Sequence, residues 1–116
     1  MNTQVEHPGD GEFGAAAEVL KLLADPTRLR IVWALLHGEH SVNELAHHVG
    51  VRASGVSQHL AKLRLAHLVR TRREGNKVFY AAENDHIEAL VREALQQADH
   101  LVGGAAHHQS RKARPA

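Results

Sequence analysis

Two short helical patterns with almost no chain between them constrain the fold of this sequence most. Ser41 and Glu44 fit a capping box, with serine at the helix start and glutamate three residues later. The helix that they predict over residues 41–49 stops at Gly50. A second segment with apolar residues at helical spacing follows at once over residues 53–65. Two short helices joined by a tight, glycine-containing turn predict a helix-turn-helix unit.

Three further helices and a hairpin are expected around this unit. They are a helix over residues 12–24, a helix that Asp25 caps and Gly38 ends, a β-hairpin of residues 68–73 and 77–81 turning at Gly75-Asn76, and a last helix that Asn84 caps and that ends near residue 102. The expected fold class is therefore mainly α (α+β), a winged helix-turn-helix. We expect one domain over residues 12–102, with flexible tails over residues 1–11 and 103–116. In the second helix, Leu29, Val32, Trp33 and Leu36 mark the expected apolar face.

The last expected helix carries an apolar stripe of four turns. Its members recur at steps of three and four residues: Ile87, Leu90, Val91, Ala94, Leu95, Ala98, Leu101 and Val102. A core this small does not cover such a stripe from one side. The stripe therefore predicts a homodimer joined through its terminal helices, with the first six of these residues at the interface.

Positive charge is concentrated in one part of the chain. The formal net charge is +1, yet residues 51–80 carry seven basic side chains and one acidic one. Such a segment on a helix-turn-helix and hairpin predicts binding of double-stranded, palindromic operator DNA. The alternative interpretation of the helix is an exposed polar face with no role in DNA binding. The expected DNA-binding residues are Arg52, Ser54, Ser57, Gln58, His59 and Lys62 on the helix and Arg70, Arg72, Arg73 and Lys77 on the hairpin.

Composition excludes several other classes of function. The chain has no cysteine, which removes disulfides, thiolate metal sites and thiol redox chemistry. No stretch approaches the roughly 20 apolar residues of a membrane span, and the polar N-terminus lacks the order of a signal peptide, so a cytoplasmic location is expected. No nucleophile elbow, P-loop or dinucleotide glycine motif is present, which argues against an enzyme.

The sequence resembles the ArsR/SmtB family of bacterial metal-responsive repressors. The resemblance rests on residues 22–31, on Ser41-Val42-Asn43-Glu44-Leu45-Ala46, on the Ser-x-x-Ser-x-His-Leu string that begins at Ser54, and on residues 68–70 and 75–80. Together these segments span roughly residues 15–102, which is most of the chain. The resemblance implies a dimer that represses transcription without its inducer and leaves DNA when the inducer binds. The cysteine pair that many members carry in the third helix is absent here, so sensing of arsenic, cadmium, lead or Cu(I) is not expected.

Histidines of the last helix and the tail suggest the inducer. His86 and His100 are 14 residues apart, or about 21 Å along a helix, so they cannot hold one ion within a protomer. If two such helices pair antiparallel, His86 of one chain meets Asp99 and His100 of the other. By resemblance, Asn84 and Gln97 stand where the family's tetrahedral zinc site has ligands. Because neither residue is a histidine or an aspartate, two of the four ligands of that zinc site are missing. The sequence instead resembles the nickel- and cobalt-sensing, KmtR/NmtR-like branch, in which a His-His pair in the tail adds ligands, here His107 and His108.

The expected function is therefore a transcriptional repressor that Ni(II) or Co(II) releases from operator DNA. Up to five N/O ligands per site are expected from His86, Asp99, His100, His107 and His108. Zn(II) as the effector is an alternative, as is a dimer that senses no metal and responds to another ligand or to a partner protein. A nickel storage or delivery protein is a further alternative.

Overall fold

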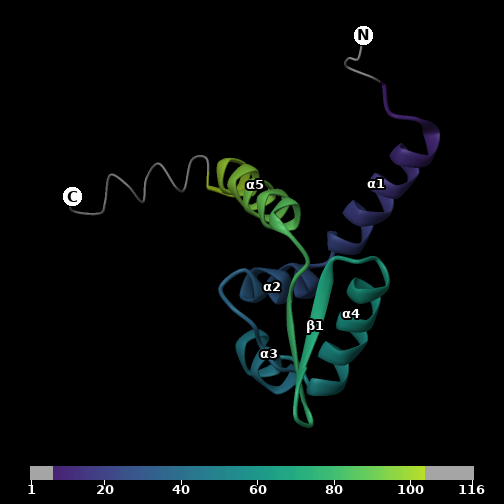
Figure 1. Cartoon of the computed structure of the whole chain (residues 1–116). Helices are drawn as coiled ribbons and strands as arrows, with labels where there is room; N and C mark the ends of the chain where they lie inside the picture. The colour runs from purple at the N-terminus through teal and green to yellow at the C-terminus, as the bar shows by residue number, and fades with distance from the viewer. Residues whose placement is uncertain (1–6, 104–116) are drawn as a thin grey trace. The chain divides into compact units, whose positions relative to one another are not determined.

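A computed structural model describes residues 7–103 of the chain (Figure 1). The elements follow in the order α1 (Asp10–Leu23), α2 (Pro26–Leu35), α3 (Val42–Val49), α4 (Ala53–Leu65), β1 (Val69–Glu74), β2 (Lys77–Ala82) and α5 (Asp85–Val102). The mainly α winged helix-turn-helix arrangement predicted from the sequence is confirmed. The chain forms two compact units, of which the first ends at Glu83 and the second begins at Asn84.

Side-chain caps fix where the helices begin. The Asp25 carboxylate accepts a hydrogen bond from the Arg28 backbone N–H at 2.9 Å and starts α2. Ser41 and Glu44 form the expected capping box of α3, with bonds of 3.2 and 2.8 Å. At the start of α1, the Glu12 carboxylate accepts from the Gly9 N–H at 3.0 Å, and the helix begins two residues earlier than the sequence predicted.

The core of the first unit is aliphatic, and the residues that α2 contributes overlap only in part with the apolar set noted in the sequence. Ile31, Val32 and Leu35 are buried, whereas Trp33 is 39% exposed. Of the four apolar residues at helical spacing, Val32 is buried, Leu29 and Leu36 are half-buried, and Trp33 is the most exposed. Its indole makes an edge-to-face contact with the imidazole of His37, with ring centroids 4.7 Å apart. Helical spacing allows either set of apolar residues to face the core, and the packing of α2 on α3 and α4 decides between the two sets.

Two glycines permit the tight turn between α3 and α4. Gly50 ends α3 in the left-handed region with φ +70°, where a side chain is strained. A Cβ on Gly55, in the first turn of α4, would lie 3.0 Å from Cγ1 of Val51. The missing side chain therefore lets α4 approach the turn closely.

The hairpin, or wing, consists of β1 and β2 in antiparallel register from Val69 opposite Ala82 to Glu74 opposite Lys77. Gly75, with φ +64°, and Asn76 form the two-residue turn predicted from the sequence. Tyr80 exchanges two backbone hydrogen bonds with His40, of 2.8 and 3.1 Å. These bonds fasten the wing to the segment that leads into α3.

Candidate nucleic-acid interface and effector helix

Helix α4 separates a buried face from a polar exposed one. Val56, Leu60 and Leu63 are fully buried and hold the helix in the core. Five of the residues predicted to contact DNA from this helix lie on the exposed face: Arg52, Ser54, Ser57, Gln58 and Lys62. Short side chains near the start of the helix and longer polar ones beside them are suited to a major groove.

His59 differs from its neighbours on α4. Its side chain is half-buried, and its Nδ1 lies 3.2 Å from Nη1 of Arg28 on α2. The structure therefore places His59 in a contact within the protein, although the sequence suggested a contact with DNA. Sequence reasoning missed Arg28, because the two residues are 31 positions apart and neither spacing nor charge patterning connects them.

On the wing, Arg70, Arg73 and Lys77 are exposed, whereas Arg72 is already paired. Its guanidinium bonds to the Glu39 carboxylate at 2.8–3.1 Å and to Glu74 at 3.1 Å. It also lies 5.0 Å from the centre of the Phe79 ring.

These contacts give Arg72 a different electrostatic environment from that of the neighbouring basic residues. The hydrogen bond from Arg72 lowers the pKa of Glu39, and the carboxylates of Glu39 and Glu74 raise the pKa of Arg72. The positive charge of Arg72 is therefore compensated locally. For Arg72 to contact phosphate as predicted, the phosphate would have to compete with these two carboxylates.

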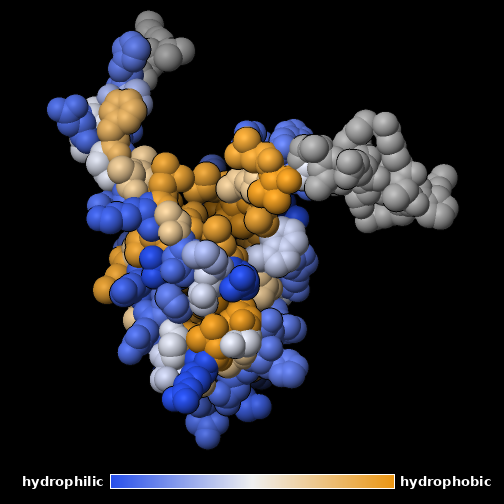
Figure 2. Space-filling view, turned by 180° about the vertical axis from the view of Figure 1, so that it is seen from behind, coloured by the Kyte–Doolittle hydropathy of each residue, from blue (hydrophilic) through white to orange (hydrophobic). Residues whose placement is uncertain are grey.

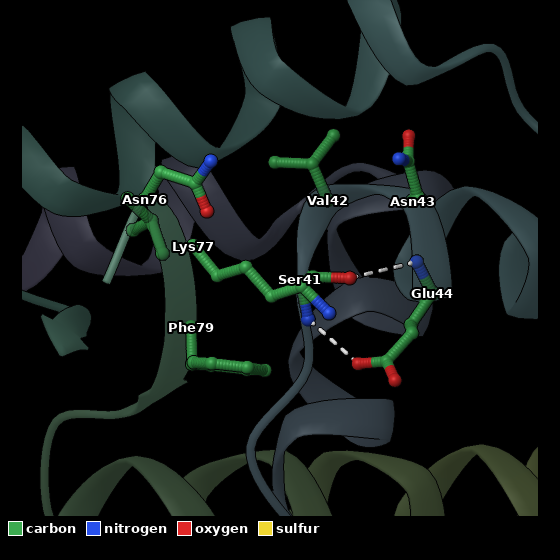
Figure 3. A pocket seen from close by; sticks show the side chains of 8 residues that line it. Ser41, Val42, Asn43, Glu44, Asn76, Lys77 and Phe79 are labelled. Carbon is green, nitrogen blue, oxygen red and sulfur yellow. Dashed lines mark hydrogen bonds between the residues drawn. The ribbon is translucent and has the colours of Figure 1, made fainter. Parts of the chain in front are cut away.

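A groove lies between the wing and the start of α3 (Figure 3). In this view the Lys77 side chain reaches from the wing toward Ser41 and the capping box. The lining residues are Ser41, Val42, Asn43, Glu44, Asn76, Lys77, Val78 and Phe79. Hydrophilic side chains predominate at the end of the molecule that the wing, α3 and α4 form (Figure 2). The candidate DNA surface therefore combines α4, the wing and the start of α3.

The predicted effector residues of the second unit lie on α5. His86, Asp99 and His100 are exposed, and the backbone N–H of His86 donates to the Asn84 cap at 3.0 Å. Within residues 7–103 of one chain, no three histidine, aspartate or glutamate side chains come together as a metal site. His107 and His108 lie outside the described residues.

The apolar stripe of α5 is covered unevenly. Ile87 and Val91 are buried within the single chain, and Leu90 and Ala98 are half-buried. Farther along, Leu95 is 40% exposed, Leu101 74% and Val102 82%. The first unit also exposes a large apolar side chain at each of two positions of α1, Phe13 and Leu20. Within the single chain, the later part of the stripe is therefore more exposed than Ile87 and Val91.

A helix-turn-helix with a polar recognition face, followed by a basic β-hairpin, defines a winged-helix DNA-binding protein. Residues 25–71 match the family described as bacterial regulatory protein, arsR family. The chain is 50% identical over 99 residues to the HTH-type transcriptional regulator KmtR of Mycobacterium tuberculosis, covering 85% of this chain and 76% of KmtR. The chain therefore belongs to the arsR family, and the predicted resemblance to the KmtR-like branch is confirmed.

Two further proteins extend the comparison. The chain is 43% identical over 82 residues to the HTH-type transcriptional regulator CmtR of Mycobacterium bovis, covering 71% of this chain and 70% of CmtR. A homodimeric winged helix-turn-helix domain from M. bovis, Mb0332, superposes with a TM-score of 0.75 and 27% identity, over 86% of this chain and 95% of that one. The protein is thus a DNA-binding transcriptional regulator and not an enzyme. In the described part of the chain, no helix has the length and hydrophobicity of a membrane span.

Proposed function

We propose that this protein is a cytoplasmic, homodimeric repressor that leaves a palindromic operator when it binds Ni(II) or Co(II). The observation that carries the metal part is the set of exposed imidazole and carboxylate groups of His86, Asp99 and His100 on α5. The similarity to KmtR and CmtR, two regulators of the same family, supports it.

DNA recognition follows from the exposed face of α4 and from the wing. Gln58 and Arg52 are able to bond adenine and guanine edges in the major groove, and Ser54 and Ser57 keep the surface slim. Lys62, Arg70, Arg73 and Lys77 would neutralise phosphates and make affinity fall with added salt. In a two-fold dimer the two α4 helices read two half-sites, so the operator is expected to be palindromic.

The residues of α5 fit a metal that prefers nitrogen and oxygen ligands. Because His86 and His100 are separated by about 21 Å of helix, ligands for one ion come from both protomers. His86 of one α5 and Asp99 and His100 of the other would hold the ion, with His107 and His108 completing the set. A bound ion would act here as a cross-link between its ligands and would take part in no reaction. Ligation by both protomers favours one arrangement of the two α5 helices.

This arrangement would be one whose α4 helices no longer match successive major grooves. Metal and DNA then oppose each other reciprocally, as any coupling between two sites requires.

DNA affinity with and without metal tests the proposal. A duplex selected in vitro with the metal-free full-length protein serves as the probe, and fluorescence anisotropy is measured with Ni(II), Co(II) or Zn(II). We expect Ni(II) and Co(II) to weaken binding at least about tenfold. The His86→Ala/His100→Ala double variant keeps metal-free affinity and loses the response, whereas His37→Ala, an exposed histidine on another segment, keeps both.

Each other outcome has a defined meaning. Unchanged affinity at saturating metal would exclude metal sensing and leave a DNA-binding dimer that answers to another ligand or partner protein. A response to Zn(II) alone would assign the α5 residues to zinc. Many ions bound per protomer without binding of any duplex would indicate storage or delivery.

A further inference from the structure

The Arg28 guanidinium connects three helices of the first unit. Arg28 lies in the first turn of α2, where its backbone N–H donates to Asp25. Its Nε donates to the carbonyl oxygen of Leu22 near the end of α1. Its Nη1 lies 3.2 Å from Nδ1 of His59 on α4. One side chain at the start of α2 therefore contacts both the end of α1 and helix α4.

A hydrogen bond between Arg28 and His59 is possible in only one protonation state of the imidazole. A guanidinium has five N–H donors and no acceptor. Nδ1 of His59 must therefore accept, which requires a neutral imidazole with its proton on Nε2. An imidazolium carries protons on both nitrogens and has no lone pair to offer. Protonation of His59 abolishes the contact and places a second positive charge beside Arg28.

Arg28 and Asp25 are charged residues that interact with His59. Arg28 repels an imidazolium, whereas Asp25 attracts one. The hydrogen bond from the Arg28 backbone lowers the pKa of Asp25, and the charge of Arg28 lowers it further. Asp25 is therefore ionised throughout the range in which imidazoles titrate, and an imidazolium at His59 is drawn from Arg28 toward Asp25.

We propose that Arg28 and His59 are positioning residues that set the orientation of α4 for DNA recognition, and that the link forms only while His59 is neutral. Buried Val56 and Leu60 hold α4 in the core, but apolar contact is non-directional. The directed Arg28–His59 bond supplies the orientation. His59 adjoins Gln58, so a rotation of α4 displaces the residues that face DNA together. This inference rests on DNA binding alone and does not depend on the metal proposal.

A direct contact between His59 and DNA, as the sequence suggested, makes the opposite prediction for pH. An imidazolium that bonds phosphate would strengthen binding in acid. A link that is lost on protonation weakens specific binding in acid. The sign of the pH dependence therefore separates the two roles.

The experiment compares the metal-free full-length wild type with His59→Asn and His59→Gln. Affinity for the selected duplex and for an unrelated duplex is measured from pH 8.0 to 5.5 at constant ionic strength. The Asn Oδ1 stands close to the place of Nδ1 and accepts at every pH, whereas the Gln amide lies farther out. All other histidines are the same in the three proteins, so a difference between their pH profiles is due to residue 59.

We expect wild type and His59→Asn to bind alike at pH 8.0. At pH 5.5 the wild type should bind the selected duplex at least about fivefold more weakly than His59→Asn, while the unrelated duplex shows no such difference. His59→Gln should be weak throughout, and Arg28→Lys, which keeps the charge but loses the planar fork, should resemble it.

Parallel pH profiles of wild type and His59→Asn, or stronger wild-type binding in acid, would overturn the inference. If His59→Gln does not fold, as circular dichroism will show, the comparison of wild type with His59→Asn still decides. Failure of the wild type and of all variants to bind either duplex would instead contradict DNA binding itself.

Discussion

At the scale of single residues, Arg72 and Arg73 are neighbours in sequence with different surroundings. Arg72 is bonded to Glu39 and Glu74, whereas no ion pair to Arg73 is present among residues 7–103. A DNA phosphate that binds Arg72 has to displace the carboxylates of Glu39 and Glu74. The binding of Arg72 to phosphate therefore adds less to the salt dependence than the binding of an unpaired arginine does. Arg73 offers an uncompensated charge.

Removing each arginine in turn should reveal this difference. We expect Arg73→Gln to lower DNA affinity and to reduce the slope of log K against log salt by about 1 for each protomer, and hence by about 2 for the dimer. Arg72→Gln should change that slope by much less. Titrations between low and moderate salt measure both. Equal slopes for the two variants would show that Arg72 leaves Glu39 and binds phosphate.

At the scale of elements, α4 is held by its buried face and contributes its other face to recognition. Leu60 is fully buried, and Leu65 at the end of the same helix is 83% exposed. The two leucines thus allow the same substitution to be compared in two environments on one helix.

We expect Leu60→Ala to lower the free energy of unfolding by about 2–5 kcal/mol, because it removes buried methyl groups and leaves a cavity. Leu65→Ala should change it by less than about 0.5 kcal/mol. Urea denaturation followed by circular dichroism measures both. A large loss in Leu65→Ala would mean that this exposed side chain is covered in the dimer, which sedimentation of the variant would then reveal.

Element boundaries were predictable from the sequence wherever a local cap or turn defines them. The caps Asp25, Ser41 and Asn84 and the Gly75-Asn76 turn act over two to four residues, which a sequence displays directly. Contacts between distant positions were not predictable. The Arg28–His59 and Arg72–Glu39 contacts span 31 and 33 residues, and both involve residues that patterning alone assigned to DNA.

At the scale of the whole molecule, the predicted dimer would cover the exposed later part of the α5 stripe. Leu101 belongs to that stripe, whereas Gln96 lies on the opposite face of the same helix and is also exposed. The predicted dimer explains why such apolar side chains are retained at the surface.

Introducing a charge at each position tests the dimer. The wild type is expected to sediment at twice the chain mass of 12.7 kDa. Leu101→Glu should weaken the dimer by more than about tenfold, because it would bury an unpaired charge. Gln96→Glu, with the same charge on the opposite face, should leave the dimer intact. Analytical ultracentrifugation over a concentration series measures both, and an unaffected Leu101→Glu dimer would exclude Leu101 from the interface.

The division of the chain after Glu83 bears on how such a regulator diversifies. The residues proposed to read DNA all precede this point, and those proposed to receive the signal all follow it. Substitutions that alter the inducer can therefore accumulate in α5 and beyond while the DNA-reading residues stay unchanged. A lineage built in this way can acquire a new stimulus for an old set of genes, and a protein engineer can exchange the same segment for the same reason.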